Sequence, residues 1–311
     1  MSSAPVAVID IGSNSIKLLV AVRDSAGAVT ALHTRTLEAR ISAGISHANP
    51  VLSEDGMRRG LEAVRTLLVD AATFAAGRVV LVATSAVRDA GNGPDFRERI
   101  HAATGHRLRI LTGVEEANLI GRGLTCDPAL GALQDFYVFD LGGGSLECLA
   151  FRQRHITQAV SLPLGCVRLT ERFVSDPEAP FSPAALEAIA NHTREVIAGS
   201  GFDFALSPAS TSVGTGGTVA TMRAILSARE GKPFAQSSPT VTVVQVAELL
   251  RSLGTMPLAQ RRQVAGLPPN RADIFPTALA SLLALAEGQG LPAYRHSLFN
   301  LRYGLAAEAL A

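Results

Sequence analysis

The pattern of apolar and polar positions divides the chain into two halves that begin alike. Each half opens on an apolar run that ends in an aspartate, turns through glycine and small polar residues, and continues into a second apolar run. The first copy spans residues 6–20, with Asp10 at the turn, and the second spans residues 136–151, with Asp140 at the turn. Apolar runs separated by a glycine turn are typical of β-hairpins. We therefore expect two related α/β lobes that face one cleft.

After each hairpin the pattern predicts strands that alternate with helices. Ser53 is a candidate N-cap, because Glu54 and Asp55 follow it and complement the helix dipole. The expected elements of the first half are strands at 29–37, 79–83 and 108–111, helices at 54–76 and 94–103, a helix from 113 onward, and a polar loop at 84–89. Those of the second half are strands at 136–140, 146–151, 155–161 and 294–298, a glycine-rich turn at 211–218, and helices at 183–198, 218–229, 245–253, 257–264, 271–287 and 301–310.

Composition narrows the classes of function. The chain has 311 residues and is 47% hydrophobic, enough for two domains with sizeable cores. A formal net charge of +1 gives no sign of a nucleic-acid or membrane partner. Three widely spaced cysteines indicate neither a disulfide framework nor a structural zinc site. With no basic leader at the N-terminus and no apolar run long enough to cross a bilayer, we expect a cytoplasmic protein, as a monomer or a homodimer.

The two glycine turns are candidate phosphate sites. Their residues are Gly12, Ser13, Asn14 and Ser15 in the first and Gly142, Gly143, Gly144 and Ser145 in the second. Glycine can adopt a positive φ and lets the backbone approach a ligand, and consecutive N–H groups can form an anion-binding concavity. The segment Gly214, Gly216, Gly217 and Thr218 precedes a predicted helix, and a helix N-terminus behind glycines suits an anion as well.

Three acidic residues are candidate ligands of a divalent cation. Asp10 and Asp140 end buried strands, and Glu147 stands in a strand that is otherwise apolar. Carboxylate oxygens suit Mg²⁺, and a buried carboxylate is costly unless it is paired or coordinating. The alternatives are that the aspartates only hydrogen-bond their own turns, and that Glu147 faces solvent on an edge strand.

Arg88 and the pair Glu115 and Glu116 have both a chemical and a plain structural interpretation. Arg88 follows a buried strand and can grip a phosphate through its planar fork, or it can pair with Asp89. The two glutamates open a helix, where an acid complements the dipole, although either could be catalytic. The chain has no P-loop motif, no dinucleotide-binding G-x-G-x-x-G and no nucleophile elbow, which excludes those classes of site.

Taken together, the motifs resemble the exopolyphosphatase/guanosine pentaphosphate phosphohydrolase (Ppx/GppA) family, in its short two-domain form. The resemblance covers essentially the whole chain, and the ordered set of motifs is more specific than any one of them. The matching segments are residues 10–15, 84–89, 113–117, 140–147, 162–170, 214–218, 271–274 and 301–304. The family implies an α/β fold with two actin-like domains, of the ribonuclease H-like superfamily of actin, sugar kinases and Hsp70 chaperones, and a cleft between them. We place these domains at 1–123, completed by a helix at 301–311, and at 124–300.

The resemblance also implies roles for the candidate residues. Glu116 matches the catalytic base that activates water, and Arg88 matches the arginine that contacts the reacting phosphate. Asp140, Glu147 and Asp10 match acids of the metal and phosphate site, with Mg²⁺ or another divalent cation as cofactor. The glycine turns match the phosphate loops. The implied reaction is hydrolysis of the terminal phosphoanhydride bond of inorganic polyphosphate, or removal of the 5′ γ-phosphate of guanosine pentaphosphate.

Two departures from the family pattern bear on the substrate. Many relatives have an arginine where this chain has Asn118, which removes one positive charge near the expected site. The chain also lacks the additional C-terminal domains of the long family members, so we expect a preference for short polyphosphate or a nucleotide. Two other functions stay open: an ATP-dependent phosphotransferase or ATPase of the same superfamily, and a non-catalytic sensor that binds polyphosphate or guanosine alarmones.

Overall fold

The computed structural model describes residues 4–207 and 210–311, so residues 1–3 of the predicted first domain and residues 208–209 of the second lie outside it. The chain forms two compact units. Unit 1 comprises Met1–Gly131 and Phe299–Ala311, and unit 2 comprises Ala132–Leu298. The chain therefore leaves the first unit once and returns to it for its last helix. The two domains predicted from the sequence, 1–123 completed by 301–311 and 124–300, stay a prediction.

Unit 1 is built on a mixed five-stranded sheet in the order β3-β2-β1-β4-β5. β1 pairs antiparallel with β2 and parallel with β4, so the hairpin and the following β-α connections share one central strand. Residues Val6–Ile9 of β1 are almost fully buried, which explains their continuous apolar run. The strands are β1 (Val6–Ile11), β2 (Ser15–Arg23), β3 (Val29–Glu38), β4 (Arg78–Ala83) and β5 (Leu108–Ile110).

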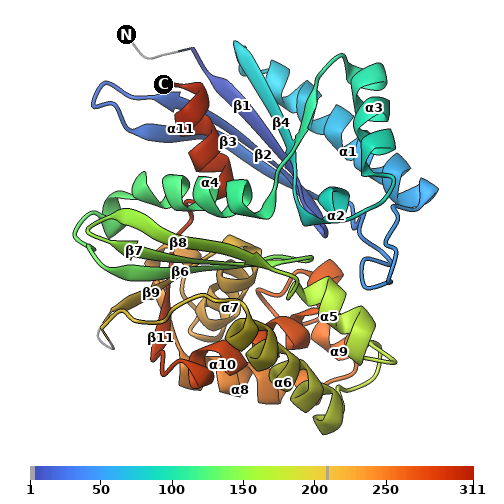
Figure 1. The fold of residues 1–311 in the computed structure, drawn as a ribbon, viewed down its shortest axis with the longest axis vertical. Coiled ribbons are helices and arrows are strands. Elements are labelled where there is room, and N and C mark those ends of the chain that lie inside the picture. The colour runs from blue at the N-terminus through green and yellow to red at the C-terminus, as the bar shows by residue number, and fades with distance from the viewer. Residues whose placement is uncertain (1–3, 208–209) are drawn as a thin grey trace. The chain divides into compact units, whose positions relative to one another are not determined.

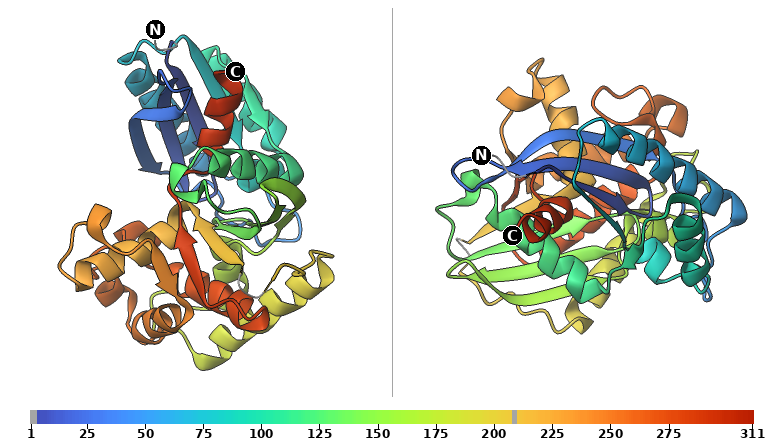
Figure 2. Two further views of the ribbon diagram at one scale, coloured as in Figure 1. Left: turned by 90° about the vertical axis from the view of Figure 1, so that its left-hand side faces the viewer. Right: turned by 90° about the horizontal axis from the view of Figure 1, so that it is seen from above.

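Helices cover both faces of this sheet, as the two side views make clear (Figures 1 and 2). α1 and α3 pack on one face, while α4 and the C-terminal α11 pack together on the other. Ser53 caps α1 as predicted, because its side chain accepts a hydrogen bond from the Gly56 N–H. The helices are α1 (Glu54–Ala72), α2 (Ser85–Arg88), α3 (Gly93–Thr104), α4 (Gly113–Thr125) and α11 (Leu301–Ala309), with a 3₁₀ turn, η1 (Pro128–Leu130).

Unit 2 repeats the hairpin at the start of a mixed six-stranded sheet, in the order β10-β11-β9-β6-β7-β8. β6 takes the place that β1 has in unit 1: it pairs antiparallel with β7 and parallel with β9. The strands are β6 (Phe136–Leu141), β7 (Leu146–Arg152), β8 (His155–Leu162), β9 (Thr211–Thr215), β10 (Thr240–Thr242) and β11 (Ala293–His296).

The helices of unit 2 form a layer against its sheet. α7 packs on β6, β9, β10 and β11, and the largely apolar α10 packs against α5, α6 and α8. The Tyr294 hydroxyl of β11 donates to the Leu282 carbonyl of α10 over 2.6 Å, which ties the sheet to this layer. The helices are α5 (Cys166–Phe173), α6 (Pro183–Gly199), α7 (Gly216–Arg229), α8 (Val243–Gly254), α9 (Leu258–Arg261) and α10 (Phe275–Gly288), with 3₁₀ turns η2 (Phe234–Gln236) and η3 (Pro269–Arg271).

Most predicted elements are confirmed, with several exceptions. α5 and β10 were not predicted, and the helix predicted at 257–264 is only the short α9. Residues 84–89 are not a loop, because α2 forms one helical turn there. Residues 211–218 are not a turn throughout: β9 continues to Thr215 because it pairs with β6, and α7 begins directly at Gly216. The predicted helix at 271–287 begins only at Phe275.

Candidate active site

The first predicted phosphate turn, Gly12–Ser15, joins β1 to β2 and is closed by a backbone hydrogen bond. The Gly12 N–H donates to the Ser15 carbonyl over 3.1 Å. The buried Ser13 Oγ lies 3.1 Å from the Oγ of Ser85, the first residue of α2. Because α2 follows β4, the parallel neighbour of β1, two strand ends of one sheet meet at this turn.

Asn14 is held from both sides of its amide group. Its Nδ2 donates to Oε2 of Glu38 over 2.7 Å, and its Oδ1 accepts from Nε of Arg40 over 3.0 Å. The residue is 8% exposed. The Asn14 side chain is thus already engaged by residues at the end of β3 and just beyond it.

Asp10 carries an unsatisfied oxygen. It is the penultimate residue of β1, and its buried Oδ1 has no hydrogen-bond partner among the described residues. Burial raises the pKa of the Asp10 carboxyl above its ordinary value, and the positive charges of Lys17 and Arg302 partly offset that rise. A buried polar oxygen without a partner is costly, so a bound ligand at this position would stabilise it.

The two predicted catalytic residues form an ion pair in unit 1. Nη1 of Arg88 lies 2.6 Å from Oε2 of Glu116, which is only 6% exposed. Arg88 ends α2 and Glu116 lies in the first turn of α4, so consecutive connections of the sheet bring them together. Arg88 also donates from Nε to Asp89 Oδ1 over 3.3 Å and from Nη1 to the Leu111 carbonyl over 3.3 Å. The pairing with Asp89, considered as an alternative above, therefore coexists with the pairing with Glu116.

The adjacent Glu115 has a different and clearly structural task. It forms a capping box with Thr112 at the start of α4 and pairs with Arg109 over 2.8 Å. The hydrogen bond from Arg109, with those from Thr112, lowers the pKa of the Glu115 carboxyl to about 2. The two glutamates point to different environments, and only Glu116 is buried beside a cation. Asn118 is exposed and donates to the Val114 carbonyl of its own helix over 2.9 Å.

In unit 2, Asp140 and Glu147 face each other across the hairpin. They are directly paired in the register of β6 and β7, so their side chains leave the same face of the sheet, about 5 Å apart at Cβ. Glu147 is 2% exposed, which excludes the edge-strand interpretation, and its Oε1 accepts from the Ser161 hydroxyl of β8 over 2.7 Å. Asp140 is half-buried, and two neighbouring carboxylates repel each other unless a cation or a proton lies near them.

The second phosphate turn, Gly142–Ser145, is closed like the first, by a 2.9 Å hydrogen bond from the Gly142 N–H to the Ser145 carbonyl. None of Gly142, Gly143 and Gly144 uses the positive φ that glycine permits. The turn packs closely against the start of α5. A Cβ on Gly165, which caps α5, would lie 2.2 Å from backbone atoms of Gly144 and 2.3 Å from one of Gly143.

The third glycine segment brings α7 to Asp140. Gly216 has a φ of +77°, and a Cβ there would lie 2.0 Å from Oδ1 of Asp140. The start of α7 therefore packs directly on the carboxylate that ends β6. Thr218 is fully buried, and its hydroxyl donates to the Leu141 carbonyl over 2.7 Å, so it supports the strand and does not point to a ligand.

Some residues around these turns were not assigned a role from the sequence. Nε of Arg168 donates to the Gly144 carbonyl over 3.0 Å, and Nη2 of Arg271 donates to the Thr218 hydroxyl over 3.3 Å. Both arginines lie in segments that match the family motifs. An arginine near a glycine turn is a sequence signal from which a role at the phosphate turns could have been predicted. Ser85 gave no signal of its own, because its hydrogen bond to Ser13 spans 72 residues of sequence.

The comparison with protein families decides the assignment. The model of the Ppx/GppA phosphatase family matches residues 3–310. The chain belongs to this family. It is accordingly a phosphoanhydride hydrolase, as the ordered motifs led us to expect.

Solved structures of Ppx/GppA proteins share the fold over nearly the whole chain. An exopolyphosphatase-like protein aligns with a TM-score of 0.88 at 22% identity, covering 99% of this chain and 98% of its own. An exopolyphosphatase from Cytophaga hutchinsonii gives 0.87 at 22% identity, with 98% and 97% covered. The Ppx/GppA enzyme of Aquifex aeolicus gives 0.77 at 24% identity, with 98% and 99% covered. These likenesses confirm the expected α/β fold.

The residues present fit a hydrated divalent cation better than a caged one. Within residues 4–207 and 210–311, no three His, Cys, Asp or Glu side chains gather closely enough to hold a metal ion. Unit 2 offers the pair Asp140 and Glu147, and unit 1 offers the unsatisfied Oδ1 of Asp10. Mg²⁺ keeps several waters and usually binds through one or two carboxylates and the phosphates of a substrate. The pair Asp140 and Glu147 of unit 2 fits that mode.

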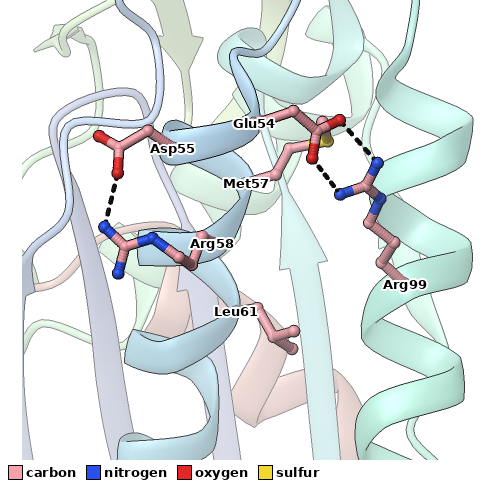
Figure 3. A pocket seen from close by; sticks show the side chains of 6 residues that line it. All are labelled: Glu54, Asp55, Met57, Arg58, Leu61 and Arg99. Carbon is pink, nitrogen blue, oxygen red and sulfur yellow. Dashed lines mark hydrogen bonds and ion pairs between the residues drawn. The ribbon is translucent and has the colours of Figure 1, made fainter.

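The surface groove drawn in Figure 3 lies apart from the predicted site residues of unit 1. It has a volume of about 480 Å³ and lies between α1 and α3, with Met57 and Leu61 among its lining. Arg99 makes a two-fold ion pair with Glu54 across it, with distances of 2.6 and 2.8 Å. Because its charged groups are already paired with each other, the groove offers no free cation to a phosphate.

None of the helices in residues 4–207 and 210–311 combines the length and the apolar character that a membrane span requires.

Proposed function

We propose that this Ppx/GppA protein hydrolyses the terminal phosphoanhydride bond of inorganic polyphosphate, releasing orthophosphate, or removes the 5′ γ-phosphate of guanosine pentaphosphate. The family supports phosphoanhydride hydrolysis in general, and the choice of these substrates is our extension of it.

The observation that carries the proposal is the 2.6 Å ion pair between Arg88 and Glu116. A guanidinium has five N–H donors, so Arg88 can hold Glu116 and still offer donors to a phosphate oxygen. This places a carboxylate beside the phosphate that Arg88 would bind. A base in that position can take a proton from the attacking water, which contributes on the order of 10²–10⁴-fold in rate.

In the proposed reaction, the water oxygen forms a bond to the terminal phosphorus while Glu116 accepts a water proton. The bond between that phosphorus and the bridging oxygen breaks, and the shortened chain leaves with the bonding electrons. Arg88 donates hydrogen bonds to the transferred group, where negative charge is spread over the outer oxygens. Phosphoryl transfer needs mainly such positioning and charge neutralisation.

The remaining predicted residues would bind and orient the substrate. We assign phosphate binding to backbone N–H groups: those of the turns Gly12–Ser15 and Gly142–Ser145, that of Gly214 at the end of β9, and those of Gly216, Gly217 and Thr218 at the start of α7. Asp140 and Glu147, with Asp10, are the residues that would hold Mg²⁺. Bound there, the ion would neutralise charge on the phosphate oxygens.

The decisive experiment measures orthophosphate release from polyphosphate, guanosine pentaphosphate and ATP in the presence of Mg²⁺. We expect the Glu116→Gln variant to lose about 10²–10⁴-fold in kcat, because the amide cannot accept the proton. Glu115→Gln is the matched control: it lies next in sequence, caps α4, and should keep nearly full activity. Equal loss in both variants would indicate a damaged helix and would remove Glu116 from its role.

The same assay separates the other functions. Turnover of ATP alone would favour the ATP-dependent enzyme over the proposed one. Binding of polyphosphate without release from any substrate would favour the sensor. A series of polyphosphate lengths tests the expected preference for short chains, and a marked preference for very long polymer would contradict it.

A further inference from the structure

Residues 38–42, which we call the bracing segment, follow the end of β3 and make four hydrogen bonds to the first phosphate turn. Two of them join backbones: the Arg40 N–H donates to the Asn14 carbonyl over 2.8 Å, and the Ser42 N–H donates to the Ser13 carbonyl over 3.3 Å. The other two are the side-chain bonds that Glu38 and Arg40 make to the Asn14 amide, over 2.7 and 3.0 Å. All four end on two adjacent residues of the turn.

Arg40 is strained, and its surroundings hold it in place. It has a φ of +37°, which is uncommon for a residue with a side chain. Its N–H is bound by Asn14, and its carbonyl accepts from Nη2 of Arg59 over 2.9 Å. Nε of Arg59, from the middle of α1, also donates to the Ala39 carbonyl over 2.8 Å. Strain that several contacts maintain next to a binding turn indicates a functional purpose.

The Asn14 amide faces the bracing segment. Its oxygen and one of its N–H groups are used by Arg40 and Glu38, and the residue is 8% exposed. A side chain that is buried and bound in this way is poorly placed to contact a phosphate. Its geometry suits an anchor, through which the turn is held in shape.

We propose that Glu38 and Arg40 are positioning residues that hold the Gly12–Ser15 turn in its phosphate-binding shape through Asn14, and that Asn14 is the anchor of the turn and not a phosphate ligand. This inference rests on the proposed function, because it takes the turn to bind phosphate. A turn fixed beforehand presents its N–H groups without loss of conformational freedom on binding. Loosening it weakens binding of substrate and transition state alike, which raises KM and leaves kcat nearly unchanged.

The first test replaces Arg40 by glycine. Arg40→Gly relieves the positive φ, which stabilises the fold, but it also takes one hydrogen-bond partner from the buried Asn14 oxygen, so the two effects on the free energy of unfolding oppose each other and the variant should still fold. We expect KM to rise about tenfold, the effect of one hydrogen bond to a charged group, with kcat within about threefold. The dissociation constant of orthophosphate, measured by calorimetry, should rise equally. Arg40→Lys keeps the charge but not the planar fork, and should behave like Arg40→Gly.

Ala75→Gly is the matched control. Ala75 has a φ of +51°, in the turn after α1, and does not bond to the phosphate turn. Glycine at this position relieves the same kind of backbone strain. The free energy of unfolding should therefore rise, while KM stays the same. If Arg40→Gly changes stability or kcat but leaves KM and orthophosphate binding as in the wild type, the positioning role is refuted.

A double-mutant cycle tests the role of Asn14. If Asn14 acts only through the bracing segment, Asn14→Ala and Arg40→Gly together should raise KM no more than the worse single change. Effects that multiply would show that Asn14 contacts phosphate independently, which contradicts the proposal. A wild type that releases no phosphate from any substrate refutes the proposed function instead, and the calorimetric comparison of orthophosphate binding then still tests the bracing segment.

Discussion

The turns Gly12–Ser15 and Gly142–Ser145 follow aspartate-ended strands and close with the same hydrogen bond, over 3.1 and 2.9 Å. Their supports differ. In unit 1 two backbone hydrogen bonds, from Arg40 and Ser42, are joined by three side-chain contacts: Ser85 on Ser13, and Glu38 and Arg40 on Asn14. In unit 2 the turn is held mainly by backbone, because the N–H groups that open α5 donate to its carbonyls. These bonds run from Cys166 to Gly142 over 3.0 Å and from Val167 to Gly143 over 2.8 Å.

The two kinds of support place different demands on the sequence. A side-chain support needs polar residues in the turn, such as Ser13 and Asn14, to receive its hydrogen bonds. The backbone support needs a residue without a side chain at Gly165, where α5 comes closest to the turn. The first kind of support can be weakened in steps by substitution, whereas the second leaves no room for a methyl group at Gly165.

The strongest test of this comparison is Gly165→Ala. The added Cβ would lie 2.2 Å from backbone atoms of Gly144, and backbone cannot move aside cheaply. Gly165 has a φ of −62°, so the penalty is purely steric. We expect the free energy of unfolding to fall by about 3 kcal/mol, and activity to fall as the turn is displaced. Urea unfolding and orthophosphate release measure the two effects.

Gly199→Ala provides the control for that substitution. Gly199 is the last residue of α6, and a Cβ there meets nothing within 4 Å. Alanine favours a helix over glycine by up to about 1 kcal/mol, so this variant should be as stable as the wild type or more so. A Gly165→Ala protein with wild-type stability would mean that α5 can shift, and that the backbone support is not rigid.

The hairpins themselves were predictable because their signal is local. Apolar runs, an aspartate and a glycine turn lie within about fifteen residues, which is the range that periodicity covers. The one-turn helix α2 was missed because a single helical turn leaves no periodic pattern. β9 was mistaken for part of a turn because its strand character comes from pairing with β6, 75 residues earlier in the register of Phe136 with Thr211.

The site residues also divide into those with a local sequence signal and those whose role depends on long-range contacts. Glu116 and Arg88 were named from motifs, and the structure brings their side chains together in unit 1. The bracing of Asn14 by Glu38 and Arg40 could not be predicted, since both residues follow the strand predicted at 29–37 and neither stands in a motif. What decides their role is the register of β2 with β3, which pairs Ser15 with Glu38. The register between two strands cannot be inferred from the composition of either strand alone.

Arg168→Lys tests a charged side chain that supports the second turn. Nε of Arg168 donates to the Gly144 carbonyl over 3.0 Å. Lysine keeps the charge but loses the directed guanidinium donor, so binding should weaken by roughly 1 kcal/mol, about fivefold in KM. Arg172→Lys, on the exposed side of the same helix, should leave KM unchanged. An unchanged KM in Arg168→Lys as well would leave the backbone as the main support of this turn, and would sharpen the contrast with unit 1.

The smallest effect concerns two buried serines beside the first turn. Ser85 and Ser42 are 3% and 2% exposed, but only Ser85 has a hydrogen-bond partner for its hydroxyl, namely Ser13, whereas the Ser42 Oγ has none among the described residues. Ser85→Ala should lower the free energy of unfolding by about 1 kcal/mol, because it leaves the Ser13 hydroxyl buried without its partner. Ser42→Ala removes an oxygen that already lacks one, so stability should be unchanged or slightly higher. Thermal unfolding of both variants measures the difference. Equal losses would show that the Ser13–Ser85 contact does not stabilise the turn, and would leave Asn14 as the point through which side chains hold it.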